Sequence, residues 1–250
     1  MVALVLCVAV EVARADHYVD NVATYEGVDP ASVREARAYQ LPAGSEYTDL
    51  VIGRYVDKHT PELIRTAVIL ERCNTKQCTA QFVPLSPNDT IEVLGLVDLA
   101  GAPGAFPDRV VDPRRGAATP LPAPARMVHP ALVLRYGESK TTTNKSYTMR
   151  DVTGTEVHEY ITVLSLERGR AYPTVFSIAV RDHYPSGGGQ DTSLRFDRAG
   201  RTGPLSIVAT EQRHLDDELA CIPPKPTETR WHLDGARYVA SDLAASTGCR

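Results

Sequence analysis

The sequence predicts a mainly β fold, an antiparallel sandwich, barrel or meander with one short N-terminal helix, and an α+β arrangement is the alternative. Many short apolar runs follow one another, separated by turn residues at short intervals, as in all-β proteins. Near the C-terminus, Asp234-Gly235 joins two such runs and predicts a hairpin with a two-residue type I′ turn, because both central residues of that turn need a positive φ.

The N-terminal residues 1–15 are typical of a secretory signal peptide. The apolar run from Val2 to Val10 is too short to span a bilayer but fits the apolar region of a signal peptide. Small residues at Ala13 and Ala15 suit a signal peptidase, so we expect the mature chain to begin at Asp16. The basic region that usually precedes the apolar run is missing, and a buried N-terminal strand or helical turn is the alternative. The sequence thus predicts a secreted or periplasmic protein.

The helix is expected over residues 30–40. Asp29 can cap it, Pro30 suits the first helical position, and Val33 and Ala36 lie on one stripe. Strand patterns dominate the rest of the chain, and we expect strands over 47–56, 63–72, 78–85, 90–98, 131–136, 155–166, 174–182, 192–197, 205–211, 229–233 and 236–240.

Seven prolines fall within residues 101–130. They divide the chain into an N-terminal β-rich part over 16–100 and a C-terminal antiparallel part over 131–250. Such a segment is either a stiff, extended spacer between two units or a long arm packed on the surface of one unit, and the sequence leaves both open.

Four cysteines remain after the predicted cleavage, and an even number in an exported chain favours disulfides. Of three possible pairings, proximity in the sequence favours Cys73 with Cys78 and Cys221 with Cys249. A zinc site is disfavoured, because zinc sites use closer cysteine pairs or neighbouring histidines. We expect no metal site and no cofactor.

Composition excludes some partners. The formal net charge is −4 and basic residues are scattered, which argues against nucleic-acid binding. The sequence contains no run of 18 apolar residues, so no transmembrane segment is expected. A protein or glycan partner is compatible with the sequence, and nothing in it identifies the partner.

The densest polar cluster is Thr155 to Tyr160. On a strand, Glu156, His158 and Tyr160 would point to the same side, where they could form a metal or acid–base site. The zinc-protease pattern of two histidines one helical turn apart is absent. The simpler interpretation is the solvent-facing side of a half-buried strand.

A second cluster is Asp182, His183 and Tyr184, followed by Gly187-Gly188-Gly189. An Asp-His pair at the end of a strand, before a glycine loop, is a frequent place for binding residues, although a plain hairpin connection is the simpler and favoured interpretation. No phosphate-loop pattern is present. The acidic stretch over 211–218 lacks calcium-loop spacing and is expected to be a solvated loop or helix face.

No serine-hydrolase pattern occurs, and paired cysteines offer no nucleophile. Trp231 could belong to a carbohydrate-binding platform, but beside a hairpin it is more often a core residue. The sequence therefore favours a non-enzymatic exported β protein with a binding or structural role. The alternatives are a secreted hydrolase or metal-dependent enzyme that uses His158, Asp182 and His183, and a carbohydrate-binding module.

Overall fold

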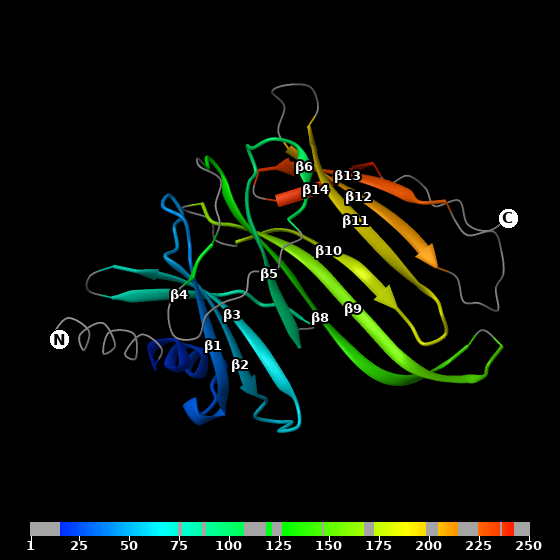
Figure 1. The fold of residues 1–250 in the computed structure, drawn as a ribbon, viewed down its shortest axis with the longest axis horizontal. Helices are drawn as coiled ribbons and strands as arrows, with labels where there is room; N and C mark the ends of the chain where they lie inside the picture. The colour runs from blue at the N-terminus through cyan, green and yellow to red at the C-terminus, as the bar shows by residue number, and fades with distance from the viewer. Residues whose placement is uncertain are drawn as a thin grey trace, which may run out of the picture.

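A computed structural model describes residues 16–74, 77–86, 89–107, 119–121, 127–146, 148–167, 173–198, 205–214, 225–235 and 237–242. The predicted signal peptide, Cys221, Cys249 and residues 215–218 of the acidic stretch lie outside the described residues. Residues 211–214 of that stretch belong to a strand rather than to a loop or helix face. Within these residues the fold is mainly β, as the sequence predicts, with two sheets and one α-helix, which spans residues 16–26 (Figure 1).

The smaller sheet has the strand order β4-β3-β2-β1-β7, and all its pairs are antiparallel except that of β1 with β7. Its strands are β1 (Val33–Gln40), β2 (Asp49–Val56), β3 (Ile64–Cys73), β4 (Cys78–Phe82) and β7 (Thr119–Pro120).

The larger sheet is antiparallel, with the order β14-β13-β12-β11-β10-β9-β8-β5, and a short strand, β6, pairs with β11 outside this path. Its strands are β5 (Thr90–Asp98), β6 (Gly104–Ala105), β8 (Pro130–Lys145), β9 (Asp151–Ser165), β10 (Thr174–His183), β11 (Gly189–Arg198), β12 (Leu205–His214), β13 (Thr227–Asp234) and β14 (Arg237–Asp242).

The expected helix over 30–40 is wrong. Asp29 accepts a hydrogen bond from the backbone N–H of Ala31 at 2.8 Å, but the turn it caps is a single 3₁₀ turn, Pro30–Ser32. The chain then continues as β1. Residues in β1 alternate between the two faces of the smaller sheet, so a period of two, rather than the helical stripe, decides the structure there.

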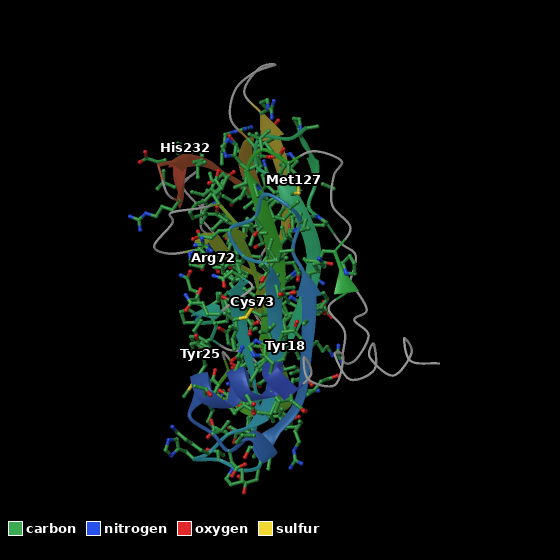
Figure 2. All side chains as sticks on the ribbon, turned by 90° about the vertical axis from the view of Figure 1, so that its left-hand side faces the viewer. Tyr18, Tyr25, Arg72, Cys73, Met127 and His232 are labelled. Atoms are coloured by element: carbon green, nitrogen blue, oxygen red, sulfur yellow. A yellow bond between two sulfur atoms is a disulfide. The ribbon has the colours of Figure 1, made fainter. Side chains whose placement is uncertain are left out.

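The real helix, over residues 16–26, covers the outer face of the smaller sheet (Figure 1). Tyr18 and Val22 are buried there against small and branched residues of the sheet, including Val51. The contact is close because Gly53 of β2 lies under the helix: a Cβ at that position would overlap the methyl groups of Val22. Figure 2 shows Tyr18 and Tyr25 together at this end of the molecule, far from His232 of the larger sheet.

A fully buried acid joins the helix to the sheet. Glu71 of β3 accepts a hydrogen bond from the Asn21 side chain, and its other oxygen lies 3.3 Å from His17 Nε2. Burial raises the pKa of the Glu71 carboxyl, while the hydrogen bonds and charge from Asn21 and His17 act in the opposite direction. Without these partners, a buried carboxylate at this position would be strongly destabilising.

The main core lies between the two sheets. Leu50, Val68 and Leu70 of the smaller sheet pack against Leu132 and Leu164 of the larger one, together with other buried apolar residues. A second core lies on the opposite face of the larger sheet, where apolar residues of the strands from β5 to β14 gather around Phe176 and Ile207. The larger sheet is therefore covered on both faces over part of its length.

The described parts of the proline-rich segment contact both sheets. β6 pairs with β11 of the larger sheet, β7 pairs with β1 of the smaller sheet, and Leu121 is buried in the main core. β5, which the sequence places in the N-terminal part, is the edge strand of the larger sheet. The described parts of the proline-rich segment are thus in contact with both sheets.

The predicted strands are confirmed within a few residues, with β8 and β9 longer than expected. Their added ends are polar on both faces and pair through threonines, such as Thr143 with Thr153. The C-terminal hairpin is confirmed, but its pairing closes with Asp234 opposite Arg237, so Gly235, with a φ of 57°, is the first turn residue rather than the second.

The disulfide between Cys73 and Cys78 is present, as predicted. The two residues are paired directly opposite each other where β3 turns into β4. The bridge closes a short hairpin, and in the chain-entropy model such a small loop contributes less than a long one.

Candidate functional site

The structure brings three predicted site residues together on the larger sheet. His158 of β9 lies between two carboxylates: its Nδ1 is 2.7 Å from Asp182 Oδ1, and its Nε2 is 2.8 Å from Glu156 Oε1. Tyr184 completes this group, with its ring edge-on to the imidazole and its hydroxyl donating to Asp182 at 3.4 Å. We call these four residues the His158 cluster.

Strand register explains the His158 cluster. His158 pairs with Asp182 on β10, and Glu156 is two residues away on the same face of β9. The same face of the sheet carries Leu132 and Leu164, which lie farther along the strands in the main core. The His158 cluster therefore lies where this face extends beyond the main core. The side chains of Glu156 and His158 are only 13% and 17% exposed, which makes the cluster sheltered rather than a freely solvated surface.

The pairing limits the chemistry of His158. An ionised carboxylate only accepts hydrogen bonds, so both pairs are complete only when both ring nitrogens carry a proton. A histidine with both nitrogens so occupied has no free nitrogen with which to take a proton from a substrate. The His158 cluster is therefore better suited to holding β9 and β10 together than to acting as a general base.

The carboxylates also act on the nearby phenols. Partial burial and, to a smaller extent, the negative charge of Asp182 raise the pKa of both Tyr160 and Tyr184 above the ordinary value. Both hydroxyls thus stay protonated at neutral pH, and that of Tyr184 donates a hydrogen bond to Asp182.

His183 belongs to a different group, on the opposite face of the sheet. It follows Asp182 directly on β10, and successive residues of a strand point to opposite faces. Its Nε2 lies 3.0 Å from Asp191 Oδ1, and the Nε2 of His214 lies 2.9 Å from Asp191 Oδ2. The triad expected for an enzyme, His158, Asp182 and His183, is therefore not assembled. We call the second group, His183, Asp191 and His214, the His183 cluster.

A cavity of about 330 Å³ opens at one end of the space between the sheets. Its floor continues the main core, with Tyr39, Ile52 and Val93 buried and Ile91 partly exposed. The size falls within the range of small-molecule sites, and the apolar floor is typical of them. We call this cavity the inter-sheet pocket.

Charged residues form the rim of the inter-sheet pocket, and they are Glu35, Arg37, Arg54, Asp89 and Glu92. Most have an opposite charge beside them: Arg37 Nε lies 2.7 Å from Glu35, and Glu92 and Asp89 face Arg135 and Arg65 at 3.9 and 4.0 Å. Arg54 is exposed and forms no ion pair with any residue that the structure describes. It is thus the cation on the rim best placed to receive an anionic group.

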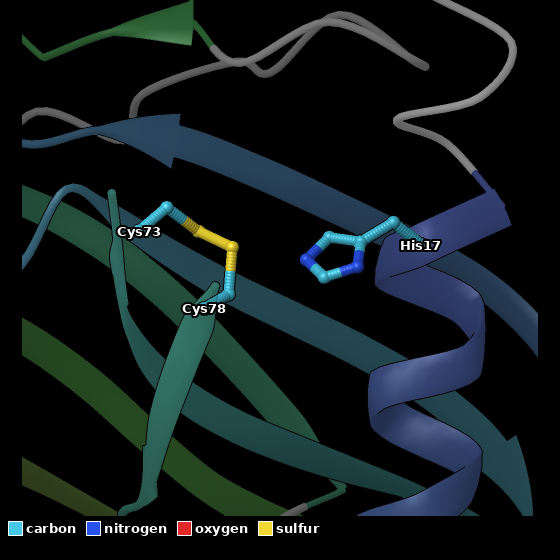
Figure 3. A group of neighbouring side chains, drawn as sticks. All are labelled: His17, Cys73 and Cys78. Carbon is cyan, nitrogen blue, oxygen red and sulfur yellow. A yellow bond between two sulfur atoms is a disulfide. The ribbon is translucent and has the colours of Figure 1, made fainter. Parts of the chain in front are cut away.

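A second hollow lies between the helix and the β3–β4 hairpin. His17 points toward the Cys73–Cys78 disulfide there (Figure 3), and the nitrogen and sulfur atoms are close enough to hold an ion. The sulfurs are bonded to each other, so they are not thiolate ligands. The hollow is lined mainly by exposed polar residues of the hairpin and lacks a buried apolar floor.

The two aromatic candidates, Trp231 and Tyr184, differ in how far they are buried. Trp231 is partly buried and packs edge-to-face on Phe176 in the second core, with ring centroids 5.5 Å apart. That placement does not favour a carbohydrate platform built on Trp231. Tyr184 is 40% exposed and belongs to the His158 cluster.

Sequence reasoning found the His158 cluster but missed the inter-sheet pocket and the His183 cluster. The missing signal for the pocket was an arginine inside an apolar strand, because Arg54 interrupts the run from Leu50 to Tyr55. The His183 cluster needs three strands in register, which one sequence does not reveal.

No protein-family model, no curated protein and no solved structure matches this chain. Among the residues that the structure describes, no helix has the length and apolar character needed to cross a membrane.

Proposed function

We propose that the protein is an exported, non-enzymatic binding protein that holds a small amphipathic molecule with an anionic group in the inter-sheet pocket. The observation that carries the proposal is the combination of a buried apolar floor with a cationic group, Arg54, on the rim. The floor favours an aliphatic or aromatic segment, because burying apolar surface contributes about 25 cal/mol per Å².

Charge arrangement supports an anionic head group. The acidic rim residues face arginines of their own, so the exposed Arg54 guanidinium remains for the ligand. Guanidinium groups bind carboxylates and phosphates through paired, charge-assisted hydrogen bonds.

The geometry of the His158 cluster supports a non-enzymatic role. The hydrolase alternative needs a histidine free to exchange protons, and His158 is held on both sides by carboxylates. His183, its expected partner, points to the other face of the sheet.

Export rests on the sequence of residues 1–15, and the disulfide between Cys73 and Cys78 is compatible with it. N-terminal sequencing of the protein recovered from the periplasm or medium of an expressing cell is expected to begin at Asp16. Material outside the cell that still begins at Met1 would contradict cleavage at this position.

Ligand binding is tested with octanoate as the probe, by isothermal titration calorimetry of the purified chain. We expect one saturable site and expect Arg54→Ala to weaken binding by at least about tenfold, because a hydrogen bond to a charged group contributes about 1.5–3 kcal/mol. The alcohol 1-octanol has the same chain without the carboxylate, and it should bind more weakly to the wild type.

The matched control is Arg150→Ala, which removes an exposed arginine from the turn between β8 and β9, far along the chain from the pocket strands. It should bind octanoate as the wild type does. Equal binding by Arg54→Ala and the wild type, or no saturable binding of octanoate, would overturn the proposal.

A further inference from the structure

We propose that His183, Asp191 and His214 form a binding site for a divalent transition-metal ion, with zinc as the representative case. The inference goes beyond the proposed ligand pocket and concerns a separate place in the fold. It rests on the geometry of the three side chains across three neighbouring strands.

Strand register places the three residues on one face. His183 of β10 pairs with Gly189 of β11, and Gly189 pairs with His214 of β12, so a glycine lies between the two histidines. Asp191 is two residues from Gly189 on the same face of β11. Both imidazoles reach the same carboxylate from opposite sides.

Gly189 is part of this arrangement. A Cβ at that position would lie 2.9 Å from His183 Cα and 3.0 Å from its Cδ2, and would overlap the carbonyl oxygen of Asp182. Only a residue without a side chain therefore leaves room for the His183 ring beside the central strand.

The ligand atoms are already close to coordinating positions. The two imidazole nitrogens lie 3.0 and 2.9 Å from the two Asp191 oxygens, and all three ligand atoms fall within 4.8 Å of one another. Ligands about 2.1 Å from a tetrahedral zinc ion are about 3.4 Å apart, so small side-chain rotations suffice to admit the ion. Two neutral imidazoles and a carboxylate are a donor set that suits zinc and copper.

The rest of the coordination sphere is open. The three side chains are 37–47% exposed, so water can occupy a fourth position, as in zinc sites that have three protein ligands. An aspartate carboxylate is ordinarily ionised at neutral pH, as a metal ligand must be.

One positive charge competes with the ion. Arg181, on the same face of β10, has its Nε 3.9 Å from Asp191 Oδ1. The guanidinium also lies 3.7 Å from Glu159, which gives it a second acidic partner when an ion occupies Asp191. Arg181 should therefore weaken metal binding without preventing it.

The test is calorimetric titration of zinc chloride into the full, untagged chain after treatment with a chelator. We expect one ion per chain. His183→Gln and His214→Gln should each weaken binding by at least about tenfold, because even the loss of an outer-shell partner lowers metal affinity about 10–100-fold. Arg181→Gln should strengthen binding, since it removes the competing charge beside Asp191.

The matched control is His158→Gln, which removes a histidine between two carboxylates on the opposite face of the same sheet. It should bind zinc like the wild type, and the zinc-dependent shifts of ring resonances in a nuclear magnetic resonance spectrum should be confined to His183 and His214. Circular dichroism melting curves verify that each variant folds. Binding that survives in folded His183→Gln and His214→Gln, binding lost in His158→Gln, or no zinc binding by the wild type would overturn the proposal.

Discussion

Replacement of Leu132 by alanine is expected to lower the free energy of unfolding by about 2–5 kcal/mol. Leu132 is fully buried in β8 and lies in the main core, which joins the two sheets. The truncation removes apolar contacts and leaves a cavity that the strands on both sides cannot fill, because each is fixed by its own ladder of hydrogen bonds. Urea denaturation followed by circular dichroism measures the change.

The control for this substitution is Leu63→Ala. Leu63 is 40% exposed, and truncation there should change the free energy of unfolding by only about 0.5 kcal/mol. Equal losses in the two variants would contradict a core shared by the two sheets.

Gly137→Ala is the second substitution with a large expected effect, about 3 kcal/mol of lost stability. Gly137 of β8 pairs opposite Glu159 of β9, and a Cβ there would lie 2.9 Å from the Cα of Glu159 and overlap the carbonyl oxygen of His158. Both obstacles are backbone atoms, so β8 and β9 must separate locally. Because the carbonyl oxygen of His158 is one of the two obstacles, we also expect the ring resonances of His158 to shift.

Gly104→Ala is the matched control, because a Cβ at Gly104 of β6 meets no atom within 4 Å. Its denaturation midpoint should be close to that of the wild type. A Gly137→Ala variant as stable as Gly104→Ala would show that β8 and β9 are not paired in this register.

Strands were predictable from the sequence because their evidence is local. Alternation and apolar runs depend on neighbouring residues, and turns mark the ends of each run. The position of the helix was predicted wrongly because that prediction also rested on local evidence. Asp29 and Pro30 form a strong local signal for the start of a helix, but in the structure they start only a single 3₁₀ turn. The spacing of Tyr18 and Val22, four residues apart, marks the real helix, but it falls directly after the expected cleavage position.

Functional groups were predictable only where one strand or one turn carries them. Glu156 and His158 are two residues apart on β9, and Asp182 directly precedes His183, so the sequence drew attention to both segments. Which face each histidine takes depends on the register of β9 with β10. The inter-sheet pocket depends on the packing of two sheets, because Arg54 and Ile91 belong to different sheets and meet only in the folded chain.

The most direct test of the central claim is an intermolecular nuclear Overhauser measurement on the chain with bound octanoate. The proposed site predicts contacts from the octanoate chain protons to the methyl groups of Ile52, Ile91 and Val93, which form the floor of the inter-sheet pocket. It also predicts that Arg54→Ala weakens these contacts at equal ligand concentration. Contacts confined to residues outside the pocket would contradict binding between the two sheets. Contacts that are unchanged in Arg54→Ala would contradict the role of Arg54 as the group that receives the carboxylate.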